Sequence, residues 1–148
     1  MPAVLNLIRE LARFENEPDA VVVTVEDLER DGFASTPLFY TYVAEVQGNI
    51  VGMALYYFRY STWKGKTIHL EDLIVTQSMR GKQIGYELYK TIMEQARSVG
   101  VRRIEWNVLN WNTAAIHFYE RSGAKILDDW KVVQMDQNGI VGFLNSEQ

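Results

Sequence analysis

The sequence contains no cysteine. Disulfide bonds, thiolate nucleophiles and cysteine-ligated metals are therefore excluded. Histidine is scarce as well, because only His69 and His117 occur, far apart and outside any HExxH-like spacing. We therefore expect no metal site, and we interpret both histidines as core or surface residues rather than as catalysts.

Long apolar runs are also missing. No stretch reaches the ~18 residues that a membrane-spanning helix needs, and the N-terminus lacks the basic region and apolar block of a signal peptide. There is no run of Lys and Arg, and the formal net charge is -4, which argues against a nucleic-acid partner and is compatible with a cationic substrate. We expect a soluble, cytoplasmic protein without membrane or nucleic-acid partners.

The composition that remains is that of an ordinary globular protein. The 148 residues are 47% hydrophobic and 23% charged, and no repeat, low-complexity tract or linker interrupts them. This length suits one domain with a real core, so we predict a single domain over residues 1–148.

The first half of the chain combines helix and strand patterns. Apolar residues recur at helical spacing over residues 3–16, and Thr24 with Asp27 forms a capping-box pattern ahead of a second, short helix. The segment Gln47-Gly48-Asn49 separates two strand-like stretches and predicts a β-hairpin. The predicted strands cover residues 41–46, 50–60 and 66–75.

The second half continues this alternation. A stripe at four-residue intervals from Ile84 to Ala96 predicts a helix that ends at Gly100. Asn112 is placed to cap a further helix. The remaining predictions are a strand over 101–109, parallel to its predecessor, a helix over 113–121 closed by Gly123, and two short strands within 124–136. Together these elements predict an α/β fold, a mixed central sheet with helices on both faces.

The segment Arg80-Gly81-Lys82-Gln83-Ile84-Gly85 connects a strand to a helix. The first turn of a helix leaves backbone amides unpaired, and together with the helix dipole they favour an anion. Glycine lets the backbone come close to a ligand or adopt positive φ. A phosphate cradle and a solvated helix start with a routine glycine turn both fit this pattern.

Two acidic residues, Glu71 and Asp72, interrupt an otherwise apolar strand. Adjacent strand residues point to opposite faces, so we expect one carboxylate to face water and the other to be paired or functional. Burial of the glutamate would raise its pKa toward the range of a general base.

Other candidates are aromatic. Tyr119 lies on the apolar face of the helix over 113–121, where a tyrosine is a core residue or a proton donor. The many Tyr and Trp side chains, together with the acidic residues, would also suit an aromatic pocket for an ammonium group, although most should be core.

Three segments together resemble the GNAT acetyltransferases: LEDLIV (70–75), MRGKQIGYELYK (79–90) and EWNVLNWNTAAIHFYERSGA (105–124). The segments LIRELARFE, DLERDGF and YYFRYSTWKGK are similar to the diamine (spermidine/spermine) and thialysine acetyltransferase branch. The resemblance covers residues 4 to about 136. It implies the GNAT acyltransferase fold, acetyl-CoA as cosubstrate, direct transfer to a primary amine, and a homodimer.

The resemblance also implies residue roles. Tyr119 would protonate the departing thiolate, and Glu71, through water, would take the proton of the amine. The acceptor pocket would be lined by Phe14, Glu15, Glu71, Asp72 and Trp130. The cofactor would be bound by Leu73, Ile74 and Val75 at the pantetheine arm and thioester, by Arg80, Gly81, Lys82, Gln83, Ile84, Gly85 and Tyr86 at the pyrophosphate, and by Asn112 and Ala115 on the following helix.

The chain departs from the family in three places. Gln83 stands where the family has its middle glycine, and we expect its backbone to stay right-handed so that its amide still donates. The family's first strand and the start of its first helix are missing. The loop before Trp130 is shorter than in the polyamine enzymes, and Ser61-Thr62 precedes Trp63 where they carry an acidic residue.

These observations lead to a functional expectation with two alternatives. We expect an acetyl-CoA-dependent N-acetyltransferase for a small primary amine, such as a diamine, a polyamine or a thialysine-like amino acid. A GNAT enzyme for another amine, such as an amino acid or a peptide N-terminus, is one alternative. A non-catalytic acyl-CoA-binding module is the other.

Overall fold

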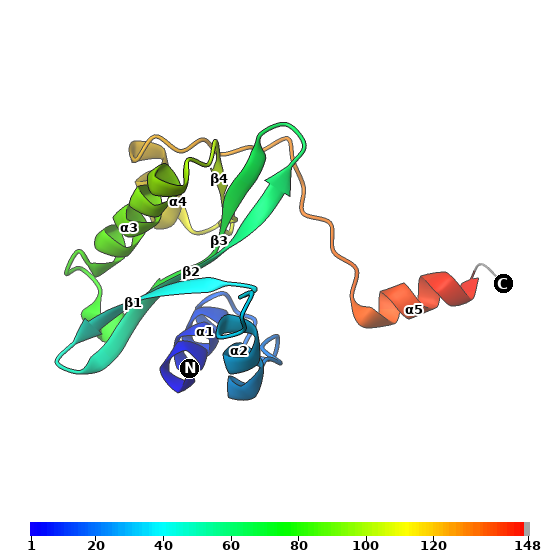
Figure 1. Cartoon of the computed structure of the whole chain (residues 1–148), viewed down its shortest axis with the longest axis horizontal. Coiled ribbons are helices and arrows are strands. Elements are labelled where there is room, and N and C mark those ends of the chain that lie inside the picture. Colours follow the sequence, from blue (N-terminus) through cyan, green and yellow to red (C-terminus); the bar gives the residue numbers. More distant parts are fainter. Residues whose placement is uncertain (147–148) are drawn as a thin grey trace. The chain divides into compact units, whose positions relative to one another are not determined.

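The computed structural model describes residues 1–146 (Figure 1). The chain divides into two compact units, Met1–Leu109 and Asn110–Gln148. We describe each by itself, and the single domain remains a prediction. The first unit contains α1 (Pro2–Phe14), α2 (Val25–Gly32), β1 (Tyr40–Val46), β2 (Asn49–Ser61), β3 (Gly65–Val75), a 3-10 turn (Gln77–Met79), α3 (Ile84–Val99) and β4 (Ile104–Glu105). The second contains α4 (Thr113–Arg121) and α5 (Gln137–Ser146).

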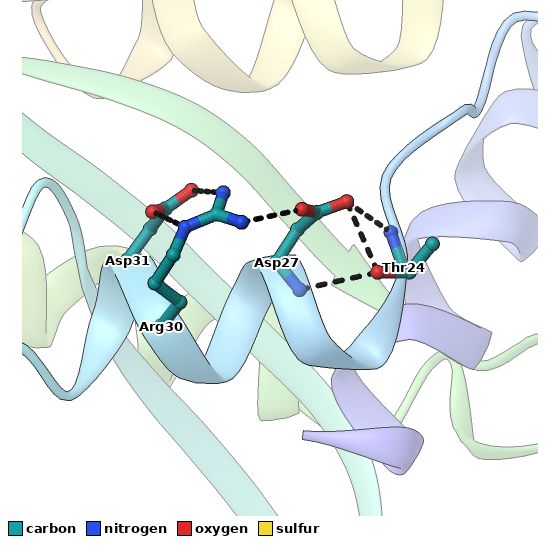
Figure 2. A network of polar contacts seen from close by, with 4 residues as sticks. All are labelled: Thr24, Asp27, Arg30 and Asp31. Atoms are coloured by element: carbon teal, nitrogen blue, oxygen red, sulfur yellow. Dashed lines mark hydrogen bonds and ion pairs between the residues drawn. The ribbon is translucent and has the colours of Figure 1, made fainter.

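The short helix α2 begins with the predicted capping box (Figure 2). The backbone N–H of Asp27 donates to Thr24 Oγ1 at 3.1 Å, and the N–H of Thr24 donates back to Asp27 Oδ2 at 3.0 Å. Arg30 bridges Asp27 and Asp31 on the same surface. The cap satisfies amides that a helix start leaves unpaired, which lets an eight-residue helix begin sharply at Val25.

The four strands form one mixed sheet in the order β1-β2-β3-β4. The β1–β2 and β2–β3 pairs are antiparallel, whereas β3 and β4, which α3 connects, are parallel as predicted. The hairpin between β1 and β2 turns at Gln47 and Gly48, whose φ values of 51° and 79° are the left-handed pair of a two-residue turn.

Helices cover both faces of this sheet, as predicted (Figure 1). One face packs against α1 and α2, where Met53 and Ile74 meet the apolar side of these helices. The opposite face packs against α3, where Ile68 and Ile92 are fully buried. The two faces therefore belong to two separate apolar clusters, and a residue's cluster shows which way its side chain points.

A β-bulge interrupts the pairing of β2 with β3. Leu55 pairs with Asp72 and Tyr56 pairs with Leu70, so Glu71 is an extra residue without a partner. Before the bulge the even-numbered residues of β3 face α3, and after it the odd-numbered residues do. Glu71 and Asp72 consequently both point to the face that carries α1. The expectation that they point to opposite faces is wrong.

The last strand is much shorter than the sequence suggested. The apolar pattern predicted a strand over 101–109, but β4 covers two residues, which pair with Ile68 and His69 of β3. Within the described chain, the part of β3 from Leu70 to Val75 therefore has no β4 neighbour along its outer edge.

In the second unit, α4 begins and ends as predicted. Asn112 Oδ1 accepts the N–H of Ala115 at 3.3 Å, and Gly123 closes the helix with φ 97°. The two short strands expected within residues 124–136 are wrong, because this segment is irregular. Among the described residues no strand pairs with it, and Val133 is 91% exposed.

The helix α5 was not predicted. Two glycines, Gly139 and Gly142, lower the helix propensity of this segment and interrupt its apolar periodicity. Asp136 nevertheless caps its start, because Asp136 Oδ1 accepts the N–H of Gly139 at 2.7 Å. No helix in the described part of the chain has the length and apolar character that crossing a membrane requires.

Candidate functional site

The loop between β3 and α3 contains two left-handed residues. Gly81 has φ 76°, and a Cβ atom there would meet nothing within 4 Å, so backbone conformation rather than space favours glycine. Gln83 has φ 64° and ψ 4°. The expectation that Gln83 stays right-handed is wrong. A left-handed residue followed by the right-handed start of a helix forms a concave group of N–H donors suited to an anion.

We expect Gln83→Gly to raise the free energy of unfolding by roughly 0.5–1 kcal/mol. Glycine relieves the left-handed strain of a residue with a Cβ atom, and this gain exceeds the extra freedom of the unfolded chain. Urea denaturation measures the change. Gln83→Ala keeps the Cβ atom and serves as the control, in which we expect no rise in the free energy of unfolding. Equal stabilisation by both variants would contradict the claim that the left-handed conformation is strained.

The N-terminus of α3 offers unpaired amides beside this loop. The first backbone hydrogen bond at the start of the helix runs from the N–H of Glu87 to the carbonyl of Gln83 at 3.0 Å, and Gln83 provides no side-chain cap. The N–H groups of Ile84, Gly85 and Tyr86 precede this bond. Arg80 and Lys82 are exposed nearby. Amides, helix dipole and cations at one place suit a pyrophosphate.

The helix α1 fixes where this loop begins. Glu10 accepts the hydroxyl of Thr76 at 2.9 Å with one carboxylate oxygen and the N–H of Gln77 at 2.9 Å with the other. Arg80 Nε donates to the Val75 carbonyl at 3.0 Å, and its guanidinium lies 5.4 Å from the centre of the Phe14 ring. Sequence reasoning missed Glu10, because its partners lie 66 and 67 residues away and leave no local pattern.

The end of β3 exposes backbone groups along the edge that β4 leaves open. The N–H of Thr76 donates to Val51 of the β2 segment at 2.8 Å. Because successive strand residues alternate, the amide of Ile74 also faces β2, whereas those of Leu73 and Val75 face the open edge. Arg80 reaches the Val75 carbonyl from this edge. Of the three predicted residues, Leu73 and Val75 can therefore donate to a ligand there.

Three carboxylates interact on the face that carries α1. Burial raises the pKa of Asp72 to about 6, with further contributions from the charges of Glu71 and Glu15. Burial, followed by the charge of Glu71, also raises the pKa of Glu15, the residue that caps the end of α1. Glu71 itself has a half-exposed side chain. Asp72 is therefore a buried carboxylate with a raised pKa beside two other carboxylates, and a cation at this place would relieve the repulsion.

Most of the aromatic residues considered for an ammonium pocket lie elsewhere. Tyr56 is buried in the cluster under α3, and Tyr60 and Trp63 are exposed at the end of β2 and in the turn after it. Tyr57 is the exception. Burial raises its pKa, as do the charge of Glu71 and a hydrogen bond to that carboxylate.

The remaining predicted residues belong to the second unit. Asn112 and Ala115 are joined by the cap of α4, which occupies the N–H of Ala115 and leaves the side-chain NH2 group of Asn112 for a ligand. Tyr119 packs edge-on against Phe118, with ring centres 5.6 Å apart. Trp130 is exposed in the irregular segment. The roles of these residues remain predictions.

Two surface depressions of the described structure lie mostly outside the predicted site residues. One surface depression is lined by Lys64, Lys66 and Arg102 with the C-terminal end of α3, and it contains none of the predicted site residues. A second lies between β1 and α3 and shares only Lys82 and Ile84 with them. In residues 1–146 there is no group of three or more His, Asp or Glu side chains arranged to hold a metal ion.

Comparison with known proteins identifies the family. The sequence model of the Acetyltransferase (GNAT) family matches residues 3–124. The chain belongs to this family, which confirms the predicted membership and fold. It is 42% identical over 134 residues to thialysine N-epsilon-acetyltransferase of Bos taurus, a match covering 85% of this chain and 79% of that protein.

A human relative is much longer than this chain. Spermidine/spermine N(1)-acetyltransferase-like protein 1 of Homo sapiens is 42% identical over 130 residues, which cover 83% of this chain and 19% of that protein. Among solved structures, an integron cassette protein of V. cholerae has a TM-score of 0.77 at 23% identity and covers 96% of this chain and 90% of its own. This last similarity concerns the fold alone.

Proposed function

We propose that the chain transfers the acetyl group of acetyl-CoA directly to a small primary amine that carries further positive charge, such as a diamine, a polyamine or a thialysine-like amino acid. The observation that carries this proposal is the group of interacting carboxylates Glu15, Glu71 and Asp72 on the α1 face of β3. Family membership supports acetyl transfer, and the names of the thialysine and spermidine/spermine relatives support a small amine.

The described backbone fits acetyl-CoA. The pyrophosphate would lie on the N–H groups from Gly81 to Tyr86, with Arg80 and Lys82 supplying positive charge. Leu73 and Val75 would donate along the open edge of β3 to the pantetheine arm and to the thioester carbonyl, with Ile74 supporting the strand between them. Donors at a developing oxyanion supply a substantial part of the barrier reduction in acyl transfer. Asn112 and Ala115 at the start of α4 complete the proposed cosubstrate site.

The chemistry requires one base and one acid. A free alkylamine has a pKa of ~10.4 and is mostly protonated at neutral pH, so a base must remove a proton before it attacks. We assign this base to Glu71, acting through water. The departing thiolate, with a pKa of ~8.5, gains from a proton donor within hydrogen-bond reach, and we assign that donor to Tyr119. The transfer is direct, and the chain has no cysteine that could form an acyl-enzyme.

The acceptor pocket would contain Phe14, Glu15, Asp72 and Trp130 besides Glu71. Phe14 and Glu15 end α1, and Asp72 follows the bulge of β3, so three of these residues come from the same face of the first unit. An ammonium group bound there would hold Asp72 in its charged form, because opposite charge lowers a carboxyl pKa.

We also propose that the active protein is a homodimer, as the family resemblance implies. Exposed apolar side chains of the second unit support an interface, among them Leu127, Val133 and Phe143. Light scattering on the purified chain checks the assembly, and the mass of a single copy would contradict it.

An amine panel tests the reaction. We expect purified protein and acetyl-CoA to release free CoA thiol with diamines, polyamines and thialysine, and to do so at least tenfold more slowly with a neutral monoamine of similar length. A thiol reagent reports the product without background, because the protein contains no cysteine. Activity only with α-amino groups or peptide N-termini would favour the other amine class. Binding of acetyl-CoA without turnover of any amine would contradict the proposed activity and favour a non-catalytic acyl-CoA-binding module.

A further inference from the structure

His69 lies two residues before Glu71 on the α1-facing side of β3. It is one of the few polar residues buried in the described structure, with a side chain 9% exposed. Its ring lies 5.2 Å from the ring of Tyr57, measured between centres, on the neighbouring strand. A buried imidazole needs partners for both ring nitrogens, and the direction of those contacts decides where its proton lies.

The contact with Arg59 determines the tautomer of His69. Arg59 Nη1 lies 3.4 Å from His69 Nδ1, and a guanidinium can only donate. Nδ1 therefore accepts, and the ring proton of neutral His69 is on Nε2. Arg59 is held in turn by Glu105 of β4, at 3.2 Å between Nη1 and Oε2. Arg103 Nε lies 3.2 Å from the other oxygen of Glu105, an ion-pair contact without hydrogen-bond geometry.

The protonated nitrogen faces the proposed base. His69 Nε2 lies 3.4 Å from Glu71 Oε2, and the same carboxylate interacts with the hydroxyl of Tyr57, whose pKa it raises. Burial lowers the pKa of His69; the charges of Glu71 and Glu105 oppose this shift, and Arg59 adds to it. At neutral pH the ring is therefore an uncharged donor that orients Glu71 without pairing with it as a cation.

We propose that His69 is a positioning residue for the acetyl transfer. Held by Arg59 in the Nε2–H form, it fixes, together with Tyr57, the orientation in which the Glu71 carboxylate receives the proton of the amine. Glu71 is the bulge residue and has no partner on β2, so its direction depends on such side-chain contacts. This inference rests on the proposed function, in which Glu71 is the base.

Kinetics of two His69 variants test the role. Glutamine can accept from Arg59 and donate to Glu71, so His69→Gln should keep kcat within about threefold of the unchanged protein. Leucine fills a similar volume without either contact, so His69→Leu should lower kcat about tenfold, because misorientation of a reacting group is costly. Its KM for acetyl-CoA should not change, and acetyl-CoA binding confirms folding. Normal kcat for His69→Leu, or equal loss in both variants, would overturn the proposal.

Nitrogen-15 NMR tests the tautomer independently of turnover. The sequence has two histidines, so His117→Gln, on an exposed helical position, leaves only the His69 signals. We expect the pattern of a neutral ring protonated at Nε2 at pH 7, and a mixture of tautomers once Arg59→Met is added. A ring protonated at Nδ1, or a cationic ring, would overturn the inference.

Glu71→Gln separates this inference from the proposed function. If Glu71→Gln keeps normal kcat, the assignment of the base fails and the positioning role fails with it. If Glu71→Gln is strongly impaired while His69→Leu is not, only the role of His69 is overturned. Impairment of both, with His69→Gln active, supports both proposals.

Discussion

Replacing Tyr119 by phenylalanine is expected to lower kcat about 100-fold, because a positioned proton donor contributes 10²–10⁴-fold to such reactions. The substitution removes only the hydroxyl. Tyr119 holds the end of α4 through its backbone carbonyl, which accepts from Ser122 and Ala124, and its ring contacts Phe118. Phenylalanine keeps these interactions, so the change should act on the chemical step.

Steady-state kinetics and calorimetric binding of acetyl-CoA measure the effect of this substitution. We expect the affinity for acetyl-CoA to change less than twofold. Tyr60→Phe is the matched control, because Tyr60 is exposed on β2 outside the proposed site and its loss should leave kcat unaltered. An unchanged kcat in Tyr119→Phe would remove Tyr119 from the mechanism, and equal losses in affinity and kcat would make it a binding residue.

Short-range patterns in the sequence predicted most of the helices and strands. The apolar stripe of α3, the capping box of α2 and the turn between β1 and β2 are local signals, and each element lies close to where its signal stands. The prediction of two strands within residues 124–136 was wrong, because a strand also needs a partner. Alternating apolar residues form a strand only when a partner strand supplies hydrogen bonds, and no local pattern shows whether one is present.

The candidate site was predicted in part. The loop from Arg80 to Gly85 could be recognised, because glycines and a helix start are visible in sequence. The bulge at Glu71 could not be recognised. The alternating pattern assumes a regular strand, and a single extra residue reverses the face to which every later side chain points. Glu10 and His69 acquire their roles through partners on other elements or through burial. Such contacts depend on the packing of α1 and β2 against β3.

Asp72→Asn is expected to stabilise the protein at neutral pH. Asp72 has a pKa raised to about 6 in the fold, above its ordinary value of 3.8, chiefly through burial. Between these values the folded chain keeps a proton that the unfolded chain has lost, so stability falls as pH rises through this window. Above about pH 6 the buried carboxylate is charged and lowers the free energy of unfolding by its full amount. Asparagine carries no charge, so we expect Asp72→Asn to raise the free energy of unfolding by roughly 2 kcal/mol at pH 7.5 and to change it little at pH 3.5. Urea denaturation at both pH values measures it.

The same substitution should weaken binding of the amine, because a buried carboxylate with this cost is useful only where a cation offsets it. We expect KM for a diamine to rise at least tenfold in Asp72→Asn. In the unchanged protein the same KM should rise as pH falls below about 6, the pKa of Asp72. That acid limb should disappear in the variant. Glu71→Gln is the matched comparison and should instead lower kcat about 100-fold with a smaller effect on KM. If Asp72→Asn lowers kcat and leaves KM unaltered, the buried aspartate rather than the bulge glutamate is the base.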